Sequence, residues 1–305
     1  MQRNFFIMQI DTSLASAKEL SLKDKLKELA ALCKFRLTFL VVVSAVFGYM
    51  YGATEFSAST LILLSVAGFL VTGSSNAFNQ VIEKELDRKM KRTGERPLVT
   101  GRLSMTEGIL IASIFGAVGL AILFFLINPL SGILGALAIF MYTVLYTPLK
   151  KITPWAVFVG AFPGAIPPML GYVAATGKFG LEPGILFATQ FMWQFPHFWA
   201  IAWVLDDDYA LGGFRLLPSK SGRSKNSAFI TLVYSLFLIP VGLLPWMFGM
   251  SGNFSAIAVV FISIIFSYYS WKLYRTCETK DAKTLMFASF FYLPLMQLFY
   301  LVDRI

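Results

Sequence analysis

Repeated apolar stretches constrain the fold of this chain more than any other feature of its sequence. They follow one another through most of the 305 residues, and each is about as long as a membrane-crossing helix. A transmembrane helix needs about 20 predominantly apolar residues to cross roughly 30 Å of hydrocarbon. We therefore predict nine membrane helices, at residues 36–53, 60–82, 106–127, 130–147, 154–175, 182–204, 227–249, 254–272 and 283–301.

The composition supports the same class. Hydrophobic residues make up 57% of the chain and charged residues only 14%, whereas soluble domains are about one quarter charged. The formal net charge of +9 would suggest a nucleic-acid partner in a soluble protein. In a membrane protein it predicts a basic face instead. We expect an all-α, polytopic helical bundle in a lipid bilayer, with no nucleic-acid partner.

The basic residues also predict an orientation. If the nine spans are correct, 24 of the 26 Lys and Arg residues fall on one side, and only Lys178 and Arg304 fall on the other. Cytoplasmic loops of membrane proteins carry this excess of positive charge. We therefore predict that the N-terminus and the basic loops are cytoplasmic.

Two regions follow from this layout. Residues 1–34 are expected to form a cytoplasmic segment that ends in an interfacial amphipathic helix, which would anchor the chain at the membrane surface. Its apolar face carries Leu22, Leu26, Leu29 and Cys33, and the charged residues around that face are Lys23, Lys25, Lys27 and Glu28. Residues 35–305 form one intramembrane domain. The N-terminal segment has no short apolar stretch followed by a small-residue cleavage site, so we do not expect a cleaved signal.

The two cysteines do not indicate a disulfide framework or a zinc site. Cys33 and Cys277 are far apart and no further cysteine accompanies either of them.

Polar residues recur every four positions where the second apolar stretch ends. Asn79, Glu83 and Asp87 fall on one face of a helix, because four residues return to nearly the same direction. Lys91 continues the row, with Arg92 and Arg96 following. Carboxylate and amide oxygens beside cations suit magnesium and a diphosphate. A solvated helix end with i,i+4 ion pairs is the other interpretation.

Two further polar clusters are expected on the same side. An acidic run that includes Asp207 and Asp208 follows the sixth stretch, and Tyr146, Lys150 and Lys151 follow the fourth. The centres of the stretches carry almost no ionisable residues, whereas coupled transporters place such groups near the midplane. The pattern favours a metal–diphosphate site at the membrane rim.

These motifs resemble those of a known family. Asn79, Glu83 and Asp87 with the downstream run 96–101 resemble the first signature of the UbiA-type intramembrane prenyltransferase superfamily. Residues 146–155, 193–198 and 208–218 resemble its protoheme-farnesylating branch. Where other superfamily members carry a further acid, four positions before Asp208, this chain has Val204. The protoheme-farnesylating branch also lacks that acid.

The resemblance implies a helical bundle with a cytoplasm-facing cavity, in which Mg2+ holds farnesyl diphosphate. It implies metal ligation by Asn79, Glu83, Asp87 and Asp208, with Asp207 a further candidate, and diphosphate binding by Arg92, Arg96, Tyr146, Lys150 and Lys151. Among nearby aromatic residues, Phe78, Tyr142, Tyr146 and Tyr209 are candidates for stabilising an allylic cation.

His197 is the only histidine in the chain. With the resemblance, it becomes a candidate ligand or orienting partner of protoheme, together with Trp193 and Gln194. A histidine satisfied by a neighbouring polar group, such as Gln194, within a packed helix is the alternative.

The implied reaction moves a farnesyl group to a vinyl group of protoheme IX and adds water, giving heme O and diphosphate. The implied location is the inner membrane of a bacterium, with a heme A synthase or an oxidase assembly protein as a further partner. A prenyltransferase acting on 4-hydroxybenzoate or another quinone precursor is the closest alternative. An isoprenoid or lipid transporter is a more distant one.

Overall fold

A computed structural model describes residues 21–305, in which all the named secondary-structure elements are helices. Within these residues the only β-type pairing is an isolated bridge between Ser251 and Arg304. The helices are α1 Leu22–Leu32, α2 Phe35–Gly52, α3 Ala58–Asp87, α4 Pro97–Thr100, α5 Met105–Ala121, η1 Ile122–Ile127, α6 Pro129–Phe140, η2 Met141–Tyr146, α7 Thr147–Leu149, α8 Ala156–Thr176, α9 Leu181–Val204, α10 Asp206–Leu211, α11 Lys225–Gly242, α12 Leu244–Met247, α13 Asn253–Thr276 and α14 Thr279–Val302.

Every apolar stretch predicted from the sequence lies on a long helix. Eight helical segments of the described chain are long and apolar enough to cross a membrane, which confirms a multi-pass bundle. The exception is α9, which corresponds to the predicted span 182–204. It has 24 residues but is not among the eight, and it carries several polar side chains, including Gln190, Gln194 and His197.

The largest difference in length concerns α3. The sequence predicted a span ending near residue 82, whereas the helix continues to Asp87. The polar ladder therefore belongs to the same continuous helix as the membrane span, as its helical spacing predicted.

Close backbone contact joins α2 to α8. A Cβ on Gly48 would lie 1.9 Å from the carbonyl oxygen of Pro168, and one on Gly171 would lie 1.9 Å from that of Ala45. Only glycine permits this approach. Three proline residues lie inside α8, and most of the helix is buried against its neighbours.

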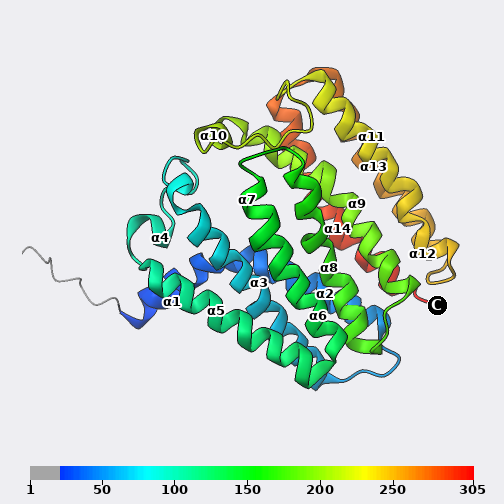
Figure 1. Cartoon of the computed structure of the whole chain (residues 1–305). Coiled ribbons are helices and arrows are strands. Elements are labelled where there is room, and N and C mark those ends of the chain that lie inside the picture. Colours follow the sequence, from blue (N-terminus) through cyan, green and yellow to red (C-terminus); the bar gives the residue numbers. More distant parts are fainter. Residues whose placement is uncertain (1–20) are drawn as a thin grey trace, which may run out of the picture.

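The two ends of the bundle differ. Figure 1 shows α4 and α10 at one end, and α12 with the C-terminus at the other. At the C-terminal end, Arg304 donates to the carbonyl groups of Met50, Tyr51 and Ala53, which closes the last turn of α2. The short helices and the long loops at the other end surround the polar ladder.

Helix α1 packs on that polar end through its C-terminus. Gln80 of α3 donates to the carbonyl oxygens of Ala31 and Leu32, at 3.1 and 2.8 Å. The sequence pattern placed Glu28 outside the apolar face of α1, and it did not predict that this side chain is buried. Glu28 is buried and pairs with Arg102 at 2.9 Å, because this side of α1 faces the loop that precedes α5.

Candidate active site

The last two turns of α3 carry the polar ladder that the sequence predicted. Asn79, Glu83 and Asp87 project from one face of the helix, and each is 3% exposed or less. Buried charges and amides need partners, because removing them from water is costly. The burial excludes the interpretation of a solvated helix end.

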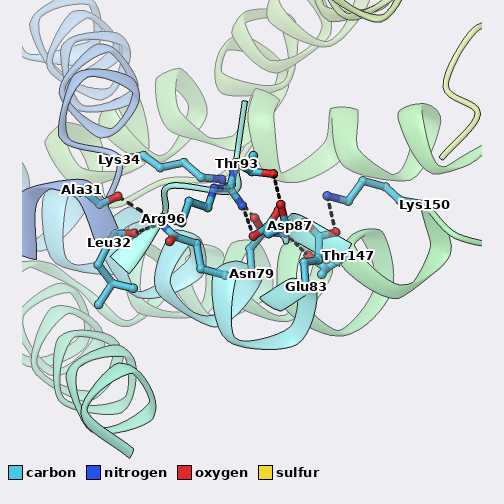
Figure 2. A network of polar contacts seen from close by, with 11 residues as sticks. Ala31, Leu32, Lys34, Asn79, Glu83, Asp87, Thr93, Arg96, Thr147 and Lys150 are labelled. Carbon is cyan, nitrogen blue, oxygen red and sulfur yellow. Dashed lines mark hydrogen bonds and ion pairs between the residues drawn. The ribbon is translucent and has the colours of Figure 1, made fainter. Parts of the chain in front are cut away.

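A different cation contacts each rung of this ladder (Figure 2). Lys34 Nζ donates to Asn79 Oδ1 at 3.1 Å, and Lys150 Nζ lies 2.5 Å from Glu83 Oε1. Asp87 receives a short contact from Arg96. The three cations come from three separate segments: the α1–α2 junction, the end of α7 and the start of α4.

Two threonines fix the positions of the ladder. Thr147 Oγ1 accepts a hydrogen bond from Asn79 Nδ2 at 3.2 Å and donates to the carbonyl oxygen of Tyr142. Thr93 donates to the backbone carbonyl oxygen of Asp87 at 2.9 Å. The amide of Asn79 is therefore oriented with its oxygen toward Lys34.

A cavity of about 170 Å³ opens over the two acidic rungs. Of the residues that the sequence singled out, it brings together Glu83, Asp87, Arg92, Arg96, Tyr142, Tyr146, Lys150 and Tyr209. Asn79 does not line the cavity, but it is bonded to Lys34, which does. The cavity is also lined by residues that the sequence analysis did not select: Lys34, Leu37, Met90, Phe214 and Leu216.

Aromatic rings cover the cations of the cavity. Lys150 Nζ lies 5.0 Å from the centre of the Tyr146 ring and 5.3 Å from that of Phe214. Arg92 lies 5.8 Å from the centre of the Tyr209 ring. Such contacts attract a cation to the ring face. They help to hold the basic side chains at the cavity.

The cavity has an excess of positive charge. Four basic side chains line it, against two carboxylates. Burial lowers the pKa of Lys34 well below its usual value, and the nearby charges of Arg96 and Lys150 lower it further. Burial also lowers the pKa of Lys150, although the Glu83 carboxylate opposes this. A bound anion would relieve both effects.

The second acidic cluster divides into two parts. Asp208 contacts the loop between α3 and α4, because its Oδ1 accepts a hydrogen bond from the backbone N–H of Lys91 at 2.7 Å. Asp207 is 88% exposed and pairs with Arg223 at 2.9 Å. Arg223 also donates to the carbonyl oxygen of Trp203 at the end of α9. It therefore fixes the turn from which Asp208 projects.

Two carboxylate oxygens of the site fit a metal ion. Asp87 Oδ1 and Asp208 Oδ2 are buried, and no donor among the described residues bonds to them. No three His, Cys, Asp or Glu side chains of residues 21–305 converge on one point. Magnesium usually takes only one or two protein carboxylates and completes its shell with water and phosphate oxygens. The donor set is compatible with that arrangement.

Five of the residues predicted for the diphosphate, the metal and the allylic cation do not line the cavity: Asn79, Asp207, Asp208, Lys151 and Phe78. Lys151 is exposed and does not line it, although Lys150 beside it does. Phe78 packs with Leu32 and Leu98 on another side of α3. Of the four aromatic candidates, Tyr142, Tyr146 and Tyr209 line the cavity.

The predicted heme-site residues separate onto two faces of α9. His197 Nδ1 lies 2.7 Å from Ser289 Oγ of α14, and its ring stacks on that of Trp193. Gln194 instead faces α8 and donates to the carbonyl oxygen of Ala161 at 2.8 Å. Gln194 is therefore not the polar partner of His197.

Lys34 is the main residue of the site that sequence reasoning missed. It has a left-handed backbone conformation, with φ of 49°, at the junction between α1 and α2. Its position directly before an apolar stretch on the basic side is the one signal in the sequence, and that signal fits a membrane-surface anchor equally well. Thr147 was also missed, although it lies within the stretch 146–155.

Comparisons with known proteins agree with this geometry. The family model described as the UbiA prenyltransferase family matches residues 41–293. The chain is 47% identical over 277 residues to a protein of Cytophaga hutchinsonii named protoheme IX farnesyltransferase, covering 90% of this chain and 96% of that protein. It is 46% identical to a protein of the same name from Christiangramia forsetii, covering 92% and 94%.

Solved structures share the fold. A structure described in work on digeranylgeranylglyceryl phosphate synthase in membranes gives a TM-score of 0.77 at 20% identity, covering 92% of this chain and 98% of that one. A UbiA homolog from Archaeoglobus fulgidus, bound to GPP and Mg2+, gives 0.66 at 14% identity, covering 90% and 99%. The chain is a multi-pass membrane protein that belongs to the UbiA prenyltransferase family.

Proposed function

We propose that this chain transfers the farnesyl group of farnesyl diphosphate to a vinyl group of protoheme IX, with addition of water, giving heme O and diphosphate. One observation carries the general chemistry: the acidic rungs of α3 and four basic side chains share a single buried cavity. The relatives named protoheme IX farnesyltransferase support the choice of acceptor, since they match the chain over most of its length.

The diphosphate is held by the cations of the cavity. Lys34, Lys150 and Arg96 line the same cavity, and each is now paired with an oxygen of the ladder. When these cations turn to the diphosphate, the oxygens of Asn79, Glu83 and Asp87 are released. Arg92 adds a fourth positive charge, and the Tyr146 hydroxyl is a further donor.

Mg2+ is the metal that this donor set fits. Asn79, Glu83 and Asp87 would hold one ion and Asp208 a second, and Asp207 would take part only if it left Arg223. A bound magnesium ion would neutralise charge that develops on the leaving oxygen.

The aromatic lining favours departure of the diphosphate. As the C1–O bond of the farnesyl group breaks, its electron pair leaves with the diphosphate and positive charge develops on the allylic carbons. The ring faces of Tyr142, Tyr146 and Tyr209 lie around the cavity and can stabilise that charge. The terminal vinyl carbon of protoheme then bonds to C1. Water adds to the neighbouring carbon and loses a proton.

His197 is proposed to orient protoheme, with Trp193 beside it. Gln194 faces α8, so it would support this site by holding α9 against α8. We further propose that the cavity faces the cytoplasm of a bacterial inner membrane, with the N-terminus on the same side. The basic residues concentrated at that end support this orientation. Delivery of the product to a heme A synthase or an oxidase assembly protein remains a prediction.

The test is a product assay. Purified protein in detergent is incubated with protoheme, farnesyl diphosphate and Mg2+, and the extracted heme is measured by mass spectrometry. An Asp87→Asn variant should lose product at least 100-fold. Glu85→Gln is the matched control, because Glu85 is an exposed acid on the same helix and pairs only with Arg88. It should retain activity.

The same preparation is then offered 4-hydroxybenzoate. Prenylation of this acid without any heme product would keep the cavity and its chemistry but exclude protoheme as the acceptor. Movement of farnesyl diphosphate across liposomes without release of diphosphate would instead support a transporter.

A further inference from the structure

The single histidine of the chain is held by a serine of a distant helix. His197 Nδ1 lies 2.7 Å from Ser289 Oγ, and these residues are 92 positions apart, on α9 and α14. Among the described residues, Ser289 supplies the only hydrogen bond of the imidazole. The contact therefore decides which ring nitrogen carries the proton.

The proton of the serine hydroxyl is already in use. Ser289 Oγ lies 2.6 Å from the carbonyl oxygen of Met286, to which it donates. Two oxygens at this separation need a proton between them, because their lone pairs would otherwise face each other. A hydroxyl has only one proton, so Ser289 must accept at its other contact. His197 Nδ1 is then the donor.

A neutral imidazole that is protonated at Nδ1 is unprotonated at Nε2. Nε2 then carries a free lone pair, which is the form that binds a metal. Histidines that ligate metals commonly donate their other ring N–H to an oxygen in this way, which fixes both the tautomer and the direction of the ring.

The surroundings hold the ring plane as well. The Trp193 ring stacks on the imidazole, with centroids 4.3 Å apart and planes 18° apart, and the Phe290 ring meets it edge-on at 5.4 Å. Trp193 Nε1 donates to the backbone carbonyl oxygen of Ser289 at 3.1 Å. Ser289 thus anchors both the imidazole and the indole that covers it.

We propose that Ser289 is a positioning residue that locks His197 in the Nδ1–H tautomer, so that Nε2 binds the iron of protoheme and sets the orientation of the macrocycle. The proposal rests on protoheme as the substrate. The iron is fixed by one bond, and rotation about this bond would then be limited by the surrounding side chains, so that one vinyl group is presented to the farnesyl carbon.

The tautomer is measured first, without heme. The full chain is produced with 15N-labelled histidine and a tag that contains no histidine, so the one imidazole gives the only labelled side-chain signals. Wild type and Ser289→Thr should show a protonated Nδ1 and an unprotonated Nε2. Ser289→Ala should show a mixture of the two tautomers. Ser65→Ala is the control, because Ser65 makes the same kind of intrahelical bond, to Leu61, without a histidine.

A wild-type imidazole protonated at Nε2 would overturn the proposal. So would a Ser289→Ala spectrum identical to that of the wild type in a variant that elutes as a folded, monodisperse species.

Protoheme is titrated next, and its Soret band reports the bond from nitrogen to iron. Ser289→Ala should weaken binding about fivefold to tenfold, as expected for loss of one hydrogen bond, and Ser289→Thr should restore it. His197→Ala should abolish the shift of the Soret band. An unchanged band in His197→Ala, with full formation of heme O, would overturn ligation by Nε2 and leave the proposed reaction standing. Absence of heme O from every protein, including the wild type, would overturn the proposed reaction, while the tautomer result would stand on its own.

Discussion

Lys34 and Asn79 lie 45 positions apart in the sequence, yet the Lys34 ammonium group donates to Asn79 Oδ1 at 3.1 Å. The lysine is on the junction between α1 and α2, and the asparagine is on α3. This bond draws a cation over the first rung of the polar ladder. It makes the N-terminal junction a wall of the cavity.

Replacing Lys34 should therefore weaken binding of farnesyl diphosphate. Lys34→Met removes a buried charge that faces the cavity, and a hydrogen bond to a charged group contributes about 1.5–3 kcal/mol. We expect KM for farnesyl diphosphate to rise at least tenfold, as measured by release of diphosphate. Lys89→Met is the control, because Lys89 is exposed and this substitution removes the same charge outside the cavity. Equal effects of the two changes would mean that only the general surface potential matters.

The neighbouring lysines 150 and 151 should differ strongly. Lys150 is paired with Glu83 inside the cavity, whereas Lys151 is exposed. Lys150→Met leaves a buried carboxylate without its partner and removes a diphosphate ligand, so kcat/KM should fall at least 30-fold. Lys151→Met should change it less than threefold. Comparable losses in steady-state assays would show that both lysines reach the substrate.

The contact between α2 and α8 should not tolerate a methyl group. In Gly48→Ala or Gly171→Ala, the new Cβ would meet a backbone carbonyl oxygen that cannot move alone. Overpacking of this kind typically costs about 1–3 kcal/mol, occasionally more. We expect a clearly lower melting temperature in detergent, followed by intrinsic fluorescence. Gly184→Ala, where no neighbouring atom lies within 4 Å, should melt like the wild type.

The two cysteines should differ in reactivity, and one of them reports the orientation. Burial raises the pKa of Cys33 to about 11, so its thiolate is scarce at neutral pH and its alkylation should accelerate as the pH rises toward that value. Cys277 is half-buried and lies at the end of α13, at the same end of the bundle as the cavity. A membrane-impermeant maleimide should label Cys277 in inverted vesicles but not in sealed, right-side-out ones.

The opposite pattern for Cys277 would reverse the proposed orientation. Rapid labelling of Cys33 in a variant lacking Cys277, at neutral pH, would contradict its burial beside α3.

Much of the fold was predictable, because it depends on local properties. The length of an apolar stretch fixes whether a helix can cross a bilayer, and the predicted ranges all lie on long helices. The ladder Asn79, Glu83 and Asp87 was predictable for the same reason, since the i,i+4 spacing alone places three side chains on one face. The polar side chains of α9 did not prevent its identification as a long helix.

The partners of those residues were not predictable from spacing. Lys34 reaches Asn79 only because the chain turns through a left-handed residue between α1 and α2, and Ser289 meets His197 only where α14 crosses α9. The burial of Glu28 and the exposure of Lys151 were not predictable from spacing either. Glu28 is buried although it is charged, and Lys151 is exposed although Lys150 beside it lines the cavity. The sequence by itself determined a membrane bundle with an acidic ladder, because hydrophobic length and helical period act within one segment. Tertiary structure alone decided which cation faces which rung, because those contacts depend on how distant helices pack.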